Sequence, residues 1–410
     1  MRIVFLGHAC HLIESRGCRV ITDPWLCDPA FGGLVEHDPP LGFGIGDLPP
    51  IDAIVLTHGH LDHFNAPSLA AFADKSIPVV HPAVTVTELD VNLRLLGFTN
   101  LHERADWEPF QLEGLTVVPT PSLGTIDECA YLFLAGGESF WNGADAPQPA
   151  SVTEEIAHRF GPVDLGAFSH NSFDQPSLLG LESVKDADHG PVAACESARV
   201  LGVKAALPAS SSMRWCGRRG EEITAKVIRR SADDLRARLA AELPDVEVLD
   251  LAPGDAWSRD AGVERKVVSG SPAAPADADY IHVFTGSGSR WCPSGRPSSD
   301  DTFRRDLPGL TASRRQACLG VGRRVFVSVV GDDDAAYTVD FGAPGAVPET
   351  GDVGAEYGVE VRDDDWKDLF ERRLSWQILL MSDRLRVLRF KPGPAPQGLH
   401  FVYAMQGVFP

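Results

Sequence analysis

The sequence predicts an α/β protein in which two sheets carry helices on their outer faces and a smaller α+β unit follows. Over the first 150 of the 410 residues, short β-rich runs alternate with turns. After Asp145, runs with helical spacing alternate with further strand-like runs. Residues 252–279 are then rich in alanine, proline, glycine, serine and aspartate. We therefore expect a main domain at 1–251, a linker or long loop at 252–279 and a smaller C-terminal α+β subdomain at 280–410.

The individual elements follow from local periodicity. In the first part, strands are predicted at Arg2–Leu6, Leu12–Glu14, Arg19–Thr22, Ala53–Thr57, Pro78–Val80, Thr116–Val118, Ala130–Leu134 and Ser139–Trp141, and helices at Ala66–Ala73 and Asp90–Leu96. The second part is expected to alternate the helices Val152–Arg159 and Val192–Leu201 with the strands Leu165–Phe168 and Lys204–Leu207, and to end in one long helix, Glu221–Leu243. The subdomain is expected to contain the strands Val325–Val330 and Tyr337–Phe341 and the amphipathic helix Asp364–Met381.

The charge balance excludes some classes of partner. The chain has 57 acidic and 37 basic residues, which gives a formal net charge of −20. Such a chain lacks the basic footprint of a nucleic-acid binder and would be repelled by an anionic membrane surface. The acidity has two explanations, a solvated acidic exterior or a cluster of carboxylates that binds a cation. Only three or four carboxylates belong to the cation site suggested below, so most of the acidity is expected on the exterior.

The cysteines and the start of the chain favour a cytoplasmic location. Eight cysteines are scattered without any Cys-x-x-Cys pair, which is typical of reduced thiols. The apolar stretch after Met1 is too short for a signal peptide. No apolar run approaches the roughly 18 residues of a membrane span.

The strongest motif is Thr57-His58-Gly59-His60-Leu61-Asp62-His63-Phe64, which follows an apolar strand and precedes a helix. In an extended loop, His58 and His60 point the same way and can hold one metal ion. The turn into the helix then presents Asp62 and His63 to a second ion. Imidazole together with carboxylate suits zinc, iron or manganese. The alternative is a polar turn with exposed histidines, but 3 of the 13 histidines in one short window disfavour it.

This His-x-His-x-Asp-His pattern resembles the metallo-β-lactamase superfamily. The opening Leu6–Glu14 and Ile21–Leu26, the later Trp141–Asp145 and the strand ending in His170 also resemble that superfamily. The resemblance covers about residues 1–210 and implies a four-layer αββα sandwich with the metals at one edge. Carried over to this sequence, it implies that His58 and His60 hold one metal, that Asp62, His63 and His170 hold the other, and that Asp145 bridges the two.

One departure from the superfamily concerns the first metal. Hydrolases of the superfamily usually supply a further histidine about twenty residues before the bridging aspartate, and residues 119–130 contain none. Asp127 or Glu128 could compensate, which would make the site richer in oxygen donors and favour iron or manganese over zinc. The alternative is that both are solvated turn carboxylates. His8 is expected near the same edge, as an additional ligand or as a residue that supports one.

Within the superfamily, Ile126–Leu132, Phe140–Pro149 and Phe168–Pro176 resemble the metallo-β-lactamase-like part of CMP-N-acetylneuraminate hydroxylase. That family also has a Rieske domain, whose paired Cys-x-His and Cys-x-x-His this sequence lacks. The better analogues are Rieske-less nonheme diiron monooxygenases of bacterial natural-product pathways. They imply two iron ions, O₂ as co-substrate, an external electron donor such as ferredoxin with its reductase, and hydroxylation of a C–H bond in a small natural product such as a terpenoid acid.

Two other functions stay open. The first is a dinuclear zinc or manganese hydrolase of a lactone, amide or phosphodiester, in which Asp62 would act catalytically by orienting a metal-bound hydroxide. The second is a metal-binding protein without turnover. Arg214, Arg218 and Arg219 either bind a substrate carboxylate or lie on a solvated loop.

Overall fold

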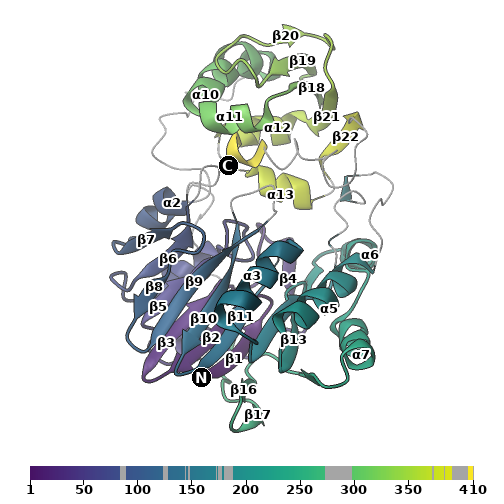
Figure 1. The fold of residues 1–410 in the computed structure, drawn as a ribbon. Coiled ribbons are helices and arrows are strands. Elements are labelled where there is room, and N and C mark those ends of the chain that lie inside the picture. Colours follow the sequence, from purple (N-terminus) through teal and green to yellow (C-terminus); the bar gives the residue numbers. More distant parts are fainter. Residues whose placement is uncertain are drawn as a thin grey trace. The chain divides into compact units, whose positions relative to one another are not determined.

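Two β-sheets lie face to face in the computed structural model and enclose the main hydrophobic core (Figure 1). The structure describes residues 1–83, 89–122, 128–143, 145, 148–171, 173, 178–179, 188–272, 298–371, 374–382, 384–389 and 405–409. The described residues fall into two compact units, which are treated separately. The first comprises Met1–Ala83, Leu96–Asp174 and Lys185–Ala278, and the second comprises Val84–Leu95, Gln175–Val184 and Asp279–Pro410.

The first sheet mixes strand directions. In spatial order its described strands are β17 (Gly262–Glu264), β16 (Ala256–Ser258), β1 (Arg2–Gly7), β2 (Cys10–Ser15), β3 (Cys18–Thr22), β5 (Ala53–Val55), β6 (Val79–Pro82) and β7 (Leu101–Arg104). The strands from β17 to β3 pair antiparallel, and β3, β5, β6 and β7 pair parallel. As a result β1, β3 and β5 run in one direction, so their carboxyl ends lie at the same edge of the sheet.

The second sheet has the same mixed character. Its described strands follow the order β15 (Glu247–Val248), β13 (Ala205–Ala209), β12 (Leu165–Ser169), β11 (Glu138–Asn142), β10 (Cys129–Ala135), β9 (Leu115–Pro121) and β8 (Phe110–Leu112). Strands β8 to β11 pair antiparallel, and β11, β12, β13 and β15 pair parallel. A separate ribbon pairs β4 (Val35–His37) with β14 (Met213–Trp215).

Helices cover the outer face of the second sheet. The helices α3 (Ala150–Phe160), α5 (His189–Leu201) and α7 (Ala232–Glu242) share a buried apolar cluster with the outward-facing side chains of β9 to β13. Figure 1 shows them beside that sheet. The predicted arrangement of two sheets with helices outside is confirmed. The other described helices of this unit are η1 (Ile45–Asp47), α1 (Ala66–Ala71) and α6 (Gly220–Val227).

Hydrogen bonds join the two sheets at the edge where β1 and β5 end. The Ser210 N–H donates to the His8 carbonyl over 2.9 Å, and the Cys129 N–H donates to the Thr57 carbonyl over 3.2 Å. The Tyr131 hydroxyl donates to the Leu56 carbonyl over 3.1 Å. These bonds satisfy backbone groups that would otherwise be buried without partners. They connect the two sheets at this edge.

The predicted linker at 252–279 is partly wrong. Residues within this range form β16 and β17, and Trp257 of β16 lies opposite Ile3 of β1. The sequence pattern hides these strands because each is only three residues long and Gly262 and Gly254 interrupt the β-rich run. The first unit therefore extends beyond residue 251 to the end of this segment.

The predicted single helix Glu221–Leu243 is also wrong, because the structure has two helices, α6 and α7, separated at 228–231. Asn171 stabilises the break: its Oδ1 accepts from the N–H groups of Arg229 and Arg230, and its Nδ2 donates to the Val227 carbonyl. Ser231 then starts α7 with a capping box, in which it exchanges hydrogen bonds with Asp234. The sequence of this range consists mostly of helix-forming residues. It could not predict the break, because the residue that stabilises it comes from a distant loop.

The second unit is the predicted smaller α+β extension. Its described strands form a sheet in the order β20 (Glu349–Thr350), β19 (Ala335–Asp340), β18 (Arg324–Val330), β21 (Tyr357–Arg362) and β22 (Arg386–Arg389). Its described helices are α2 (Leu89–Leu95), α9 (Ser299–Asp301), the π-helical η2 (Thr302–Asp306), α10 (Leu307–Ser313), α11 (Arg315–Val321), α12 (Asp363–Glu371), α13 (Trp376–Met381) and η4 (Met405–Gly407). The predicted helix Asp364–Met381 is divided, because Ser375 caps the start of α13.

Candidate metal centre

Side chains able to bind metals gather where the two sheets meet. The residues come from five strand ends: His8 follows β1, Asp23 follows β3, the segment 57–63 comes after β5, Asp145 comes after β11 and His170 follows β12. Strand ends are common places for functional side chains because the sheet fixes them while the loop leaves them accessible. The fold therefore unites residues that lie up to 162 positions apart in the sequence.

Local backbone conformation places His8 and His63. Gly7 and His8 have positive φ angles of 111° and 50°, which turn the chain from β1 back into β2. A Cβ atom at Gly7 would lie 2.9 Å from Leu41 and 3.0 Å from His37, so only glycine fits there. In the second loop, the N–H groups of His63 and Phe64 donate to the His60 carbonyl. That turn brings His63 to the strand end.

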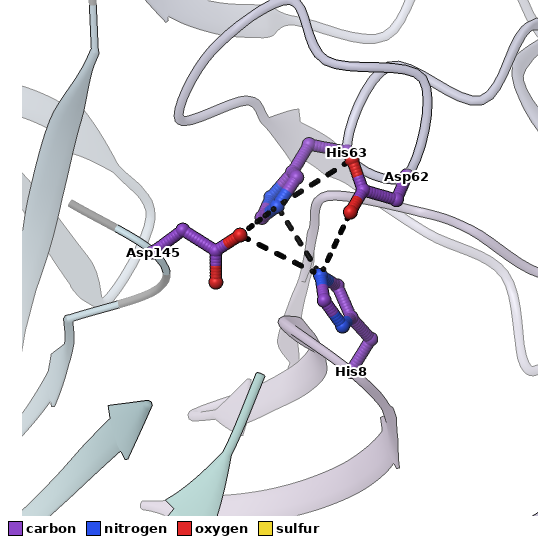
Figure 2. A group of neighbouring side chains, drawn as sticks. All are labelled: His8, Asp62, His63 and Asp145. Atoms are coloured by element: carbon purple, nitrogen blue, oxygen red, sulfur yellow. Dashed lines mark hydrogen bonds and ion pairs between the residues drawn. The ribbon is translucent and has the colours of Figure 1, made fainter. Parts of the chain in front are cut away.

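Four side chains point toward one another at this edge, His8, Asp62, His63 and Asp145 (Figure 2). One ligand atom of each lies within 4.8 Å of the others. The His8 Nε2 is 3.3 Å from both the His63 Nε2 and the Asp62 Oδ2, and the His63 Nε2 is 3.3 Å from the Asp145 Oδ2. Two imidazoles and two carboxylates at these distances are a donor set suited to a divalent cation.

A second pair lies beside this group. The His58 Nε2 is 2.9 Å from the His60 Nδ1, and the rings of His58 and His63 have centroids 4.0 Å apart. His58 is buried, and His60 is half-buried. The loop thus presents two imidazoles next to the four-residue group, as expected for a second metal position.

Asp23 orients two of these imidazoles. Its carboxylate is fully buried and accepts hydrogen bonds from the Thr57 N–H and hydroxyl, each over 2.8 Å, and from the His63 Nδ1 over 2.9 Å. Because the Thr57 hydroxyl donates to Asp23, its oxygen accepts from the His58 Nδ1, 2.9 Å away. Both imidazoles therefore keep Nδ1 engaged and turn Nε2 toward the site, which is how metal-binding histidines are usually held.

Buried charges shift the pKa values in this group. Burial disfavours a charge on His63, but the carboxylates of Asp62 and Asp23 outweigh burial and raise its pKa well above the usual value. Burial also opposes ionisation of Asp62 and Asp145, yet His63 and His8 lower the pKa of both carboxyls. Without a metal, a proton on His63 therefore balances part of the acidic charge. A bound cation would take over that role.

The fit of a metal was tested on polar atoms that lack partners. The Oδ1 atoms of Asp62 and Asp145 are buried and accept no hydrogen bond among the described residues. The Nδ1 of His170, which is 4% exposed, also lacks a partner there. Buried carboxylate oxygens without partners are costly, and a cation would compensate them. The residues present therefore fit a metal.

The sequence of this region is similar to a described family. Residues 19–209 match the profile described as the β-lactamase superfamily domain. This chain contains a β-lactamase superfamily domain. The domain has the metallo-β-lactamase fold that the resemblance implied, with its two sheets and outer helices. His8 precedes the matched range.

Relatives of this β-lactamase superfamily domain include hydroxylases. Over 174 residues the chain is 31% identical to a Streptomyces venezuelae enzyme named 4-amino-L-phenylalanyl-(CmlP-peptidyl-carrier-protein) 3-hydroxylase, covering 39% of this chain and 32% of that enzyme. Over 108 residues it is 34% identical to the cytidine monophosphate-N-acetylneuraminic acid hydroxylase of Asterias rubens, covering 25% of this chain and 16% of the hydroxylase. The crystal structure of CmlA, a diiron β-hydroxylase from Streptomyces venezuelae, superposes with a TM-score of 0.47 at 20% identity, covering 64% of this chain and 54% of CmlA.

The sequence relatives confirm the family resemblance. They also match this chain over only part of their length. The chain spans less than half the length of these curated relatives, 33% of the first mycobacterial ones and 32% of the Streptomyces enzyme, so a whole relative's activity is not carried over. No described helix of the chain is both long and apolar enough to cross a bilayer.

The residues predicted for the domain fall into three groups. The structure brings Asp62, His63 and Asp145 together and places His58 and His60 beside them. His170 is buried near the group: burial and the neighbouring His8 lower its pKa to about 4. Asp127 lies outside the described residues.

Glu128 is described and half-buried at the start of β10. Its Oε1 accepts a hydrogen bond from the Ser122 hydroxyl over 2.9 Å, and burial raises its pKa to about 7. Glu128 is thus partly shielded from solvent, and its role as a ligand stays a prediction. The charge of Asp145 also raises the pKa of this carboxyl, and the charge of His63 lowers it.

Sequence reasoning missed Asp23 and Thr57 and underrated His8, which the structure places inside the four-residue group. A signal for Asp23 existed, because an acidic residue directly follows the apolar strand Arg19–Thr22. For His8 the only signal was its position after the first strand. The arginines considered for a substrate carboxylate are exposed, and Arg214 and Arg219 already pair with Glu36 and Glu222.

Proposed function

We propose that this chain is a nonheme diiron monooxygenase that hydroxylates a C–H bond of a small natural product, using O₂ and an external reductant. The observation that carries the proposal is the carboxylate content of the site. Asp62 and Asp145 belong to the four-residue group, and the half-buried carboxyl of Glu128 is close enough for Asp145 and His63 to influence its pKa. Oxygen-rich sets with some imidazole favour iron or manganese over zinc. The hydroxylases among the relatives support the same class of reaction.

The proposed ligand assignment uses both histidine pairs. His58 and His60 would hold one iron, with Glu128 in the place where superfamily hydrolases have a histidine. Asp62, His63 and His170 would hold the other iron, and Asp145 would bridge the two. His8 would add an imidazole on the side of Asp62 and His63. When bound, the iron pair would supply the activation of O₂, which protein side chains cannot provide.

The remaining chemistry belongs to the chain. Asp23 and Thr57 hold His63 and His58 with Nε2 facing the site. His8, His58 and His63 are 1% exposed or less, so bulk water is excluded from this side. Glu128, whose pKa burial raises to about 7 in the metal-free chain, would lose its proton on binding iron. These groups position and protect the reaction without themselves being oxidised.

The substrate and the reductant are further parts of the proposal. The Streptomyces relative is named for an aminoacyl group on a carrier protein. For this chain we propose a small natural-product acid, such as a terpenoid acid, in the cytoplasm. Electrons would come from a ferredoxin and its reductase.

The test is metal content together with O₂ uptake. The chain, purified without oxygen and supplied with Fe(II), is expected to bind roughly two iron ions. After reduction without oxygen by dithionite-reduced methyl viologen and removal of the excess reductant, it is then expected to consume O₂ when O₂ is admitted. Tightly held zinc, hydrolysis of chromogenic esters and no O₂ uptake would instead support the hydrolase in which Asp62 orients the nucleophilic water.

Two variants sharpen this test. His60→Ala is expected to lose about half of the bound iron and nearly all O₂ uptake, because it removes one of the two ligands in the histidine pair. His158→Ala, which changes an exposed histidine on α3, is the matched control and should retain both. Retention of iron and uptake in His60→Ala would disprove the proposed site.

A further inference from the structure

A stretch of positive charge interrupts the acidic surface of this protein. Residues 213–230, here called the basic segment, form β14, the following loop and α6 up to the break before α7. This segment has two acidic residues, Glu221 and Glu222, in a chain whose net charge is −20. Its six basic residues are Arg214, Arg218, Arg219, Lys226, Arg229 and Arg230.

Ion pairs neutralise only part of this charge. Arg214 pairs with Glu36 over 2.6 Å, Arg219 with Glu222 over 3.1 Å and Arg230 with Asp188 over 2.7 Å. Arg218 and Lys226 are exposed and make no ion pair with any residue that the structure describes. The segment therefore presents uncompensated positive charge to solvent.

The basic segment is anchored to the candidate metal centre at one end through Asn171. This residue directly follows His170 in the sequence, is 6% exposed and bonds to the Val227 carbonyl and to the N–H groups of Arg229 and Arg230. The end of the basic segment is therefore hydrogen-bonded to the residue that follows the proposed iron ligand His170.

The other end of the segment reaches the same centre through packed rings. In β14, Met213 pairs with His37 of β4. The His37 ring lies 3.8 Å from the Trp25 ring, and Trp25 contacts the His8 ring at 5.4 Å, both measured between centroids. His37, Trp25 and His8 are all buried. Both ends of the exposed basic segment thus connect through tightly packed groups to the metal edge.

We propose that the basic segment is the docking surface for an acidic one-electron donor protein of the ferredoxin type. The proposal rests on the proposed function, because a monooxygenase converts O₂, a C–H bond, two electrons and two protons into C–OH and water. Two donor molecules would each be oxidised by one electron per turnover. An acidic donor would be attracted to the unpaired charges of this segment, which speeds its association.

The test compares two electron sources on the iron-loaded full chain. The double variant Arg218→Glu/Lys226→Glu reverses the two unpaired charges. At low ionic strength it should accept electrons from an acidic plant-type [2Fe–2S] ferredoxin about tenfold more slowly than the parent chain. Its reduction by reduced methyl viologen, followed without oxygen, should not change. Added salt should slow the parent chain and remove the difference between the two proteins.

A matched control and a binding measurement separate this inference from the proposed function. Arg16→Glu changes an exposed arginine in the turn between β2 and β3, at the opposite end of these strands, and should behave as the parent chain. Ferredoxin binding is also measured by calorimetry on the metal-free chain, where it should weaken in the double variant only. Equal ferredoxin rates and equal binding in all three proteins would overturn the docking surface. A double variant that instead abolishes self-association of the chain would also overturn it. Absence of O₂ uptake by the iron-loaded chain, once it has been reduced and freed of reductant, would refute the monooxygenase while the calorimetry still decides the surface.

Discussion

At the residue scale, the candidate centre depends on side chains that do not themselves face the metal position. Asp23 is buried and accepts three hydrogen bonds, two from Thr57 and one from His63. Through Thr57 it also fixes His58. One carboxylate therefore sets the orientation of an imidazole in each of the two proposed metal positions, and its removal should affect metal binding before it affects the fold.

The variant Asp23→Asn tests this role. The amide is nearly the same size, but its NH₂ group cannot accept a hydrogen bond from the donors of Thr57 or His63 that it would face. His58 and His63 therefore lose their fixed orientation. We expect metal affinity to fall about 10–100-fold, measured by competition with a chelator or by the Co(II) absorption spectrum. Asp52→Asn is the control, since Asp52 accepts from the Arg19 N–H on the exposed side. An unchanged Co(II) spectrum and affinity in Asp23→Asn would contradict the assignment.

At the scale of elements, the break between α6 and α7 connects the helical layer to the metal edge. A continuous helix would satisfy the backbone of 228–231 internally, and the structure satisfies it through Asn171 and Ser231 instead. Because Asn171 follows His170, the cap and the proposed ligand are fixed by the same short segment. The break between α6 and α7 therefore lies at the point where Asn171 connects it to the metal edge.

Two variants distinguish these caps. Asn171→Ala removes three hydrogen bonds at a buried position and should lower the free energy of unfolding by about 2 kcal/mol. It should also weaken metal binding, because His170 loses its fixed neighbour. Ser231→Ala removes only the start of α7 and should cost about 1 kcal/mol with metal affinity unchanged. Urea unfolding and metal titration measure both. Equal metal affinity in the two variants would show that the break serves stability alone.

At the scale of the whole molecule, the first unit concentrates buried charge at the one edge where its sheets meet. Metal binding there should be linked to stability and to pH. The pKa of His63 lies above its usual value of 6.5 in the metal-free chain. The attraction of protonated His63 to Asp62 and Asp23 therefore stabilises the chain fully below about pH 6.5, and this stabilisation is lost as pH rises through the raised pKa. The lowered pKa values of Asp62 and Asp145 act oppositely: their contribution is present above about 3.8 and is lost as pH falls.

Metal removal should therefore cost more at pH 8 than at pH 6. Binding displaces the proton from His63, so affinity rises with pH, while the metal-free chain loses the stabilisation of protonated His63. At free metal about 100 times the dissociation constant, bound metal adds about 2.7 kcal/mol, which a chelator removes. The measurement is the Tm with Fe(II) and with a chelator at both pH values, with Asp145→Asn as a variant that should show a smaller effect. An equal or larger loss at pH 6 would contradict the linkage.

The sequence by itself determined the local features of this protein. Short apolar runs bounded by turns specified most strands, such as those around Ile3 and Ala53, whose side chains are buried on both faces of the sheet. The His58–His63 motif identified the metal-binding loop, since its spacing reflects contacts within one turn. Only the tertiary structure decided the rest. It placed His8, Asp23 and Asp145 beside that loop, joined Asn171 to a helix break far along the chain, and drew β16 and β17 into a sheet. These features depend on contacts between distant segments, which local periodicity does not encode.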